Sequence, residues 1–284
     1  MRCGWLCMLL ALGTALPLRT AAQEEQDGSS SEVSADEQAP LEPNAEPGAN
    51  TAPAAVGRAT WSLRLSAGVG VGSRALDLPM DGRIYQIRSG LTPAVDLGFE
   101  LDHAVSQDVS VGLLIRYQSS VGLRIVEHLT DGTEHPRATR SQQLQLAIAP
   151  IWRLDSRARW ALGAAIGYGI SELRPESHLV TPAYFLGGPY ARFELQLPLI
   201  GERVRLRAGP EMQWIAQAGQ ELLDRDVRPH GLAVGGEAAL EVVLGRRWTV
   251  AATYRELRAW LDSAQGGTFR DVTRFITARL SGVL

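Results

Sequence analysis

The sequence predicts an all-β chain that folds as an antiparallel, up-and-down transmembrane β-barrel of ten strands. Three observations lead to this prediction. Apolar and polar residues alternate with period two in ten separate segments, the connections between these segments are alternately long and short, and aromatic residues gather near the segment ends. Period-two alternation is typical of strands with one apolar face, and alternating connection lengths are typical of barrels that cross a membrane.

Residues 1–22 are predicted to be a cleaved export signal. Arg2 gives the segment a positive start, an apolar run follows at 5–18, and small residues then offer a cleavage site. The run is shorter than the roughly 20 apolar residues that a membrane-spanning helix needs. Because Cys3 and Cys7 both lie in this segment, the mature chain is expected to have no disulfide, zinc–thiolate site or cysteine nucleophile.

Residues 23–57 differ sharply in composition from the rest of the chain. They contain eight acidic residues, no Lys or Arg, and much Pro and Ala. Such a segment buries too little apolar surface to fold, so we expect a disordered acidic tether, with an acidic partner-binding tail as the alternative. The whole chain carries −3; with +2 in the signal and −8 in the tether, residues 58–284 carry +3. Their basic residues form no cluster, which argues against nucleic-acid binding.

The segment 58–284 contains the ten predicted strands. Alternation is found at 61–71, 91–101, 109–118, 143–153, 160–171, 185–197, 204–214, 232–244, 248–255 and 276–284. Most of these runs are close to the roughly 9–11 residues that a tilted strand needs to cross a bilayer. The alternation is interrupted at Gly187, Gly188 and Pro189, where the strand prediction is weakest.

The nine connections alternate in length. Gaps at 72–90, 119–141, 172–184, 217–230 and 260–271 are long, and gaps at 103–108, 155–159, 198–203 and 245–247 are short. Barrels of bacterial outer membranes have short periplasmic turns and longer external loops. We therefore expect five long loops outside the cell and both chain ends on the periplasmic side.

Tryptophans lie near both ends of the predicted strands. Four lie where strands meet the short turns or the N-terminal segment, Trp61, Trp152, Trp160 and Trp248, and two lie toward the long connections, Trp214 and Trp260. Amphipathic rings at two levels are typical of the aromatic girdles at bilayer interfaces. Ordinary core or edge aromatics are the alternative interpretation.

The strand face opposite the apolar residues carries Gly, Ala and charged side chains. An unpaired charge cannot lie in hydrocarbon, so we expect this face to line a narrow lumen in which Arg pairs with Glu. The candidates for this lumen network, on neighbouring predicted strands, are Arg192, Glu194, Arg205, Arg207, Glu211, Glu237 and Glu241. A soluble lipocalin-like barrel would also alternate, but strand length, connections and aromatic placement favour the membrane barrel. The network would either stiffen the barrel or line a narrow pore.

Residues 58–284 resemble the bacterial outer-membrane β-barrel proteins as a broad class, among them the small barrels of eight to ten strands. The resemblance is architectural and rests on no sequence motif. It implies folding by the barrel-assembly machinery, which reads a C-terminal strand that usually ends in an aromatic residue. Here the alternation is present at the C-terminus, but Leu284 occupies the last position and Gly282 interrupts the approach to it.

Candidate catalytic residues lie on the polar connections. Ten-stranded outer-membrane proteases of the omptin type carry Asp and His at the outer rim, and the nearest cluster here is Asp224, Asp226 and His230. A carboxylate could orient an imidazole that acts as a general base, but the spacing matches no family motif, and a polar external loop is the simpler interpretation. Ser177 and His178 are adjacent and would point to opposite faces of a strand, which argues against a lipid-modifying site.

We therefore expect no catalytic residue, no metal site and no cofactor. The predicted function is a structural or surface-interaction role for an outer-membrane barrel with a charge-filled narrow lumen. A narrow ion or small-solute channel and a hydrolase at the outer rim are the alternatives. Expected partners are outer-membrane lipid, the barrel-assembly machinery and an extracellular partner bound through the long loops, and the expected location is the outer membrane of a Gram-negative bacterium.

Overall fold

The computed structural model describes residues 61–80, 83–128, 133–154, 160–176, 180–201, 203–245 and 247–284. The predicted signal at 1–22 and tether at 23–57 lie outside the described residues. The elements are β1 (Trp61–Met80), β2 (Arg83–Ser89), β3 (Thr92–Ala104), β4 (Val109–His128), β5 (Glu134–Arg153), β6 (Ala161–Pro175), β7 (Tyr184–Ile200), β8 (Val204–Ile215), β9 (Gln217–Ala218), α2 (Gln220–Leu223), β10 (Val227–Leu244), β11 (Trp248–Ser263) and β12 (Thr268–Val283). Within these residues, no helix has the length and apolar character needed to span a membrane.

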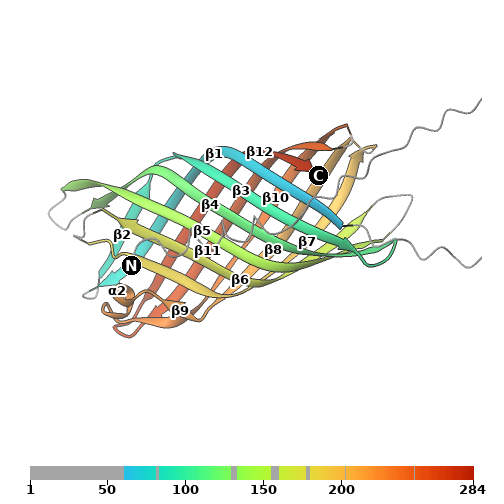
Figure 1. Cartoon of the computed structure of the whole chain (residues 1–284). Coiled ribbons are helices and arrows are strands. Elements are labelled where there is room, and N and C mark those ends of the chain that lie inside the picture. The colour runs from blue at the N-terminus through green and yellow to red at the C-terminus, as the bar shows by residue number, and fades with distance from the viewer. Residues whose placement is uncertain are drawn as a thin grey trace, which may run out of the picture. The chain divides into compact units, whose positions relative to one another are not determined.

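The long strands form one closed antiparallel sheet (Figure 1). β1 pairs with β12 from Arg64↔Val283 to Asp77↔Arg270, which joins the first strand to the last. β2 pairs with the distal part of β1 and β3 with its N-terminal part, so β2 and β3 share one position in the ring. The ring therefore has ten positions, in the order β1, β2/β3, β4, β5, β6, β7, β8, β10, β11 and β12. The predicted ten-stranded antiparallel barrel is confirmed.

The strands extend much further than the sequence pattern indicated. β1, β4 and β5 each contain 20 residues, about twice the 9–11 needed to cross a bilayer. The prediction of long loops at 72–90, 119–141 and 260–271 is therefore wrong, because most of these residues belong to strands. After β8, residues 217–218 form β9, which still pairs with β7, and the chain then leaves the sheet at 219–226, where α2 lies.

The reason is an exchange of polarity between the two strand faces partway along the barrel. Near the start of β1, Val69 faces outward and is 68% exposed, whereas Gly68 faces inward and is buried. Further along β1 the inward residues are Leu76 and Leu78, both buried, and the outward residue between them is Asp77. The outward apolar face, which is the pattern that predicts a strand, therefore ends before the strand itself does.

The barrel end opposite the C-terminus, where β2, β9 and α2 lie in Figure 1, encloses an apolar core that we call the outer core. Its fully buried residues include Leu76, Leu78, Ile87, Leu123, Ile125, Leu173, Ile215, Leu222 and Phe269. Among them Leu222 comes from α2, so this short helix packs inside the barrel mouth rather than beside it. In this half the barrel has the polarity of a soluble protein.

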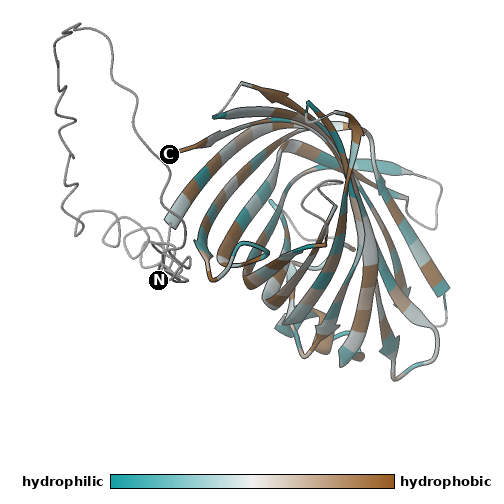
Figure 2. Ribbon diagram, turned by 90° about the vertical axis from the view of Figure 1, so that its right-hand side faces the viewer, coloured by the Kyte–Doolittle hydropathy of each residue, from teal (hydrophilic) through white to brown (hydrophobic). Residues whose placement is uncertain are grey.

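The other half has the opposite polarity. Its exposed apolar residues form an apolar belt around the outside that includes Leu65, Val69, Leu97, Leu113, Leu146, Ile148, Ile166, Phe193, Met212, Leu240, Val250 and Ile276. Figure 2 shows the alternation of hydrophobic and hydrophilic residues along the strands that produces it. Contiguous exposed apolar surface of this extent is unfavourable in water and is expected where strands face lipid.

β7 continues without a break through Gly187, Gly188 and Pro189, where the alternation was interrupted. A Cβ atom on Gly188 would lie 1.8 Å from the backbone oxygen of Trp214, so only glycine allows the end of β8 to approach so closely. Pro189 is exposed, on the outward face. The interruption reflects a close approach between strands and not a strand end.

Candidate functional site

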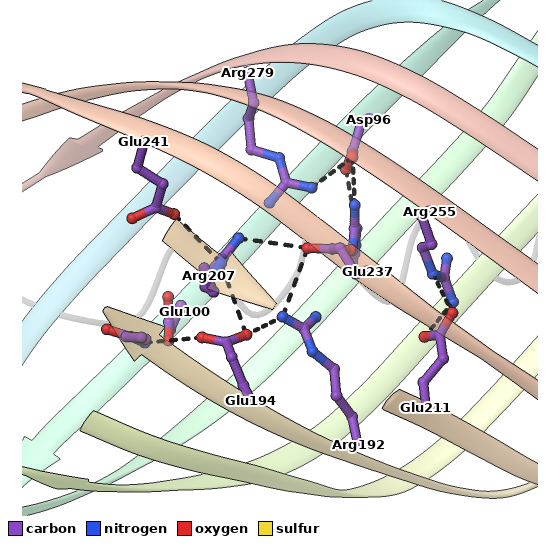
Figure 3. Close-up of polar contacts among 12 residues, drawn as sticks. Asp96, Glu100, Arg192, Glu194, Arg207, Glu211, Glu237, Glu241, Arg255 and Arg279 are labelled. Carbon is purple, nitrogen blue, oxygen red and sulfur yellow. Dashed lines mark hydrogen bonds and ion pairs between the residues drawn. The ribbon is translucent and has the colours of Figure 1, made fainter. Parts of the chain in front are cut away.

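Five of the predicted lumen residues meet in an ion-pair cluster inside the barrel (Figure 3). This lumen cluster contains Arg192 and Glu194 on β7, Arg207 on β8, and Glu237 and Glu241 on β10. Arg192 contacts Glu194, and its Nη2 lies 3.6 Å from Glu237 Oε1. Arg207 Nε lies 3.3 Å from Glu241 Oε1 and 3.7 Å from Glu194 Oε2. The three strands are neighbours in the sheet, and alternation directs these side chains inward.

Arg116 on β4 joins the lumen cluster from the opposite wall. Its Nη1 contacts the Glu237 carboxylate, and its Nη2 donates to Asp96 Oδ2 at 2.8 Å. Arg279 on β12 donates to the same Asp96 oxygen at 2.7 Å (Figure 3). Because β4 and β10 are five positions apart in a ring of ten, the Arg116–Glu237 contact crosses the barrel.

A second cross-barrel contact is centred on Arg255 of β11. Arg255 Nε donates to Glu211 Oε1 at 2.7 Å, and its Nη1 donates to Gln143 Oε1 on β5 at 2.9 Å. Tyr190 Oη donates to Glu211 Oε2 at 3.3 Å. β11 and β5 are again five positions apart, so this contact also spans the lumen.

A third cross-barrel contact lies next to the outer core. Arg74 Nε on β1 donates to Asp271 Oδ1 on β12 at 2.9 Å, and its Nη1 donates to Ser141 Oγ on β5 at 2.7 Å. Tyr184 on β7, five positions from β1 in the ring, accepts from Arg74 Nη2 at 3.3 Å and donates to Asp271 Oδ2 at 3.0 Å through its Oη. Both charged side chains are almost completely buried, with 1% and 3% exposed. Burial of a guanidinium is tolerated because a carboxylate and several neutral acceptors surround it.

A polar cavity of about 110 Å³ lies on the other side of the lumen cluster, toward Leu284 and the start of β1. Arg64, Glu100, Arg205 and Ser281 are among its lining residues. Arg64 Nη1 donates to Glu100 Oε2 at 3.1 Å. From this end, the lumen thus holds a polar cavity, then three layers of charged contacts, and then the outer core.

The seven predicted lumen residues therefore do not form one network. Glu211 pairs with Arg255 outside the lumen cluster. Arg205 lines the cavity, and no contact among the described residues joins it to a carboxylate. The other five residues make Arg–Glu contacts with one another, and their role as a lumen network stays a prediction.

Sequence reasoning missed several residues of the charged layers. Alternation placed four of them on the inner face without indicating their partners: Asp96, Arg116, Arg255 and Arg279. Arg74 and Asp271 fell in segments that were interpreted as loops. The alternation of Leu76 and Leu78 with polar residues directly after Arg74 was the signal that could have extended the strand.

The predicted interface tryptophans lie on the barrel surface. Five are exposed, Trp61, Trp152, Trp160, Trp214 and Trp248, and Trp260 is partly buried. The Trp61 ring stacks on His103 with centroids 4.3 Å apart. Their placement at the two bilayer interfaces stays a prediction.

The chain segment 180–183 is held at the outer mouth by hydrogen bonds. Glu127 and Glu221 accept backbone N–H groups of this segment at 2.8 and 2.7 Å, and Arg225 donates to one of its carbonyl oxygens. Burial lowers the pKa of Arg225 from its ordinary value, and the nearby carboxylates oppose this shift. These bonds fix the segment to β4, to α2 and to the turn that follows α2.

The candidate rim hydrolase residues are not assembled. Asp224 accepts a hydrogen bond from Gln220, and Asp226 accepts one from Gln265. The His230 side chain is exposed, and no described contact joins it to either aspartate. Ser177 and His178 lie outside the described residues, and within the described part of the chain no group of His, Cys, Asp or Glu could hold a metal.

These features define an outer-membrane β-barrel protein. A closed sheet leaves no unpaired strand edge in lipid, the apolar belt faces outward, and the charges of that half lie inside. The predicted class and the predicted location in the outer membrane are confirmed.

No protein-family model matches the chain, and no curated protein matches its sequence. The outer-membrane protease OmpT from Escherichia coli is similar in structure, with 12% identity, 78% of this chain and 97% of that chain covered, and a TM-score of 0.49. The translocator domain of the autotransporter NalP from Neisseria meningitidis has 11% identity, coverage of 78% and 88%, and a TM-score of 0.42. OprG from Pseudomonas aeruginosa has 8% identity, coverage of 79% and 95%, and a TM-score of 0.36. The likeness is one of fold alone.

Proposed function

We propose that this protein is a non-conducting outer-membrane barrel with a structural or surface-interaction role. The observation that carries the proposal is the series of contacts across the lumen. Arg116, Arg255 and Arg74 each reach a residue on the opposite wall at successive depths. Side chains in hydrogen-bond contact across a barrel leave no continuous path for hydrated ions between them.

The outer core supports the same proposal. Beyond the charged layers the interior is filled with buried Leu, Ile and Phe side chains, and hydrogen bonds hold the segment 180–183 at the outer mouth. A dry apolar constriction opposes ion passage even where it is not sterically sealed. The same packing makes the outer end a folded platform of extended strands, which suits a surface-interaction role better than five mobile loops would.

Planar-bilayer recordings test the closed lumen. We expect no regular conductance steps from wild-type protein whose insertion is verified by heat-modifiable migration on a gel. The double variant Arg116→Ala/Glu237→Ala removes one cross-barrel contact and should also remain silent, because the Arg255 and Arg74 layers and the outer core stay in place.

Reproducible wild-type steps that disappear in Glu237→Ala or Arg205→Ala would instead support the narrow channel. The rim hydrolase would require turnover of peptide or lipid substrates by wild-type protein that is lost in His230→Ala. Silent recordings together with no such turnover would support the structural or surface role.

A further inference from the structure

A cluster of outward-facing arginines lies where the apolar belt ends, on four strands that are adjacent in the ring. Arg258 on β11, Val272 on β12, Ala75 on β1 and Arg88 on β2 are successive partners in register. Strands lie about 4.8 Å apart, so this row places two arginine Cα atoms about 15 Å apart with small side chains between them. On β12, Arg274 lies two residues from Val272 toward the apolar belt, and Arg270 lies two residues from it toward the outer core. We call Arg88, Arg258, Arg270 and Arg274 the Arg patch.

Two guanidinium groups of the Arg patch, those of Arg258 and Arg274, are bound by one carboxylate, whereas that of Arg88 donates to Asp77 and to the carbonyl oxygens of Leu76 and Ile87. Glu256 accepts from Tyr254 Oη at 2.6 Å, from Arg274 Nε at 2.8 Å, and from Arg258 Nε. Both arginine side chains are still nearly half exposed, at 45% and 47%. One carboxylate thus holds two guanidinium groups by their Nε atoms.

The Arg patch has more positive than negative charge. Arg88 pairs with Asp77 at 2.7 Å and keeps 43% of its side chain exposed. The Nε atom of Arg270 is buried without a partner. Four arginines therefore face two carboxylates, Asp77 and Glu256. Such an excess favours an anion with several oxygens, because guanidinium groups bind phosphate through two parallel hydrogen bonds.

Two adjoining hollows accompany the Arg patch. A hollow of about 190 Å³ is lined by Ala75, Asp77, Arg88, Arg270, Val272 and Arg274. A larger open groove of about 600 Å³ runs along β8, β10 and β11, over Gly209, Pro210, Gly236 and Ala238, with Arg258 and Glu256 at its charged end. Most of its other lining residues are small or apolar.

We propose that the Arg patch and this groove form a binding site for a phosphorylated glycolipid of the outer leaflet. The phosphate would occupy the hollow between Arg88, Arg270 and Arg274, and an acyl chain would lie along the groove. The patch is toward the barrel end away from Leu284, directly above the apolar belt, where outer-leaflet headgroups meet the protein. A free phosphate ion would leave the groove unused. The site lies on the outside of the wall, so it does not depend on the closed lumen.

Native mass spectrometry of the folded mature protein in nonionic detergent tests this site. The probes are diphosphorylated lipid A, the same lipid with its phosphates removed, and inorganic phosphate. We expect wild-type protein to bind the diphosphorylated lipid, and Arg258→Gln/Arg274→Gln to weaken that binding roughly tenfold or more through loss of charged hydrogen bonds.

The matched control is Arg140→Gln/Arg174→Gln. These arginines also face outward, are exposed, and are cross-strand partners on β5 and β6, where no groove adjoins them among the described pockets. Their replacement should leave lipid binding within about twofold, which is within the usual range for surface substitutions. Ala238→Phe fills the groove and should weaken lipid binding severalfold while the heat-modifiable migration remains.

Each other outcome contradicts the proposal. Equal binding of the dephosphorylated lipid would show that phosphate is not recognised. Binding of inorganic phosphate as tight as that of the lipid would identify a free-anion site. Equal losses in the two double variants, both shown to be folded by their gel migration, would indicate a general charge effect rather than this site.

Discussion

Each arginine of the lumen layers that is almost completely buried has a carboxylate partner supplied by another strand. Arg74 has Asp271, Arg116 has Asp96 and Glu237, and Arg255 has Glu211. Removing a charge from water is costly, and only close partners with additional hydrogen bonds offset that cost. Arg74–Asp271 joins the first strand to the last and Arg116–Glu237 crosses the lumen, so these two pairs exist only when the barrel is closed.

Asp271→Ala should strongly destabilise the protein. The substitution leaves the Arg74 guanidinium buried without a counter-charge, and breaking a buried pair from one side costs about 3–5 kcal/mol. Urea unfolding followed by heat-modifiable migration measures the loss. The control is Asp262→Ala, at an exposed position on β11. The double variant Arg74→Met/Asp271→Leu should regain most of the stability, and no recovery would contradict the pair as the cause.

At the scale of elements, the strands keep their hydrogen-bonded pairing while the residues on their faces change in polarity along the strand. β1 keeps its pairing with β12 from Arg64 to Asp77 while its inward face changes from small and polar residues to leucines. Glycines allow close contacts within these ladders. A Cβ atom on Gly167 of β6 would lie 1.9 Å from the backbone oxygen of Leu146 on β5. Backbone atoms cannot move aside as flexible side chains do, so these positions constrain strand coiling.

Gly167→Ala should lower the free energy of unfolding by roughly 1–3 kcal/mol, because the added methyl group forces two strands apart. Gly90→Ala is the matched control, since a Cβ atom there meets nothing within 4 Å. Its effect should stay within about 0.5 kcal/mol. Refolding yield and urea unfolding of the two variants in the same detergent make the comparison. Equal stability of both variants would show that the strands separate more easily than their packing indicates.

At the scale of the whole molecule, the two halves of the barrel have opposite polarity on their inner and outer faces. The half near the start of β1 and near Leu284 is apolar outside and charged inside, and the other half is polar outside and apolar inside. The bilayer is therefore matched to the first half, and the second projects beyond it as a folded extension.

Single cysteines should reveal the direction in which the barrel crosses the membrane. With Cys3 and Cys7 in the export signal, a mature chain cut after it offers no background thiol. A membrane-impermeant maleimide should label Thr268→Cys on intact cells, because this exposed residue begins β12 at the outer end. Gln107→Cys, in the exposed turn between β3 and β4, should react only after the outer membrane is permeabilised. The reverse labelling pattern would overturn the assigned orientation.

Prediction from sequence succeeded where one strand face is lipid-exposed and failed where polarity is exchanged. The run around Leu144, Leu146 and Ile148 shows a plain period of two and is a strand in the structure. Ser73 and Asp77 face outward in a region where the outward residues are no longer apolar. The criterion of an outward apolar face therefore ended the predicted strand at residue 71, whereas β1 continues to Met80. For the site, alternation correctly placed Arg207 and Glu241 inside, but Arg205 was grouped with carboxylates that it does not contact.

The sequence by itself determined the strand class, the count of ten, the inward charges and the outward apolar belt, because these depend on a period of two residues that neighbouring positions display. The tertiary structure decided which charges meet and whether the lumen is closed. Arg116 and Glu237 are 121 residues apart in the chain and five strands apart in the ring. Their contact depends on the diameter and register of the closed barrel, and no local pattern along the chain contains either quantity.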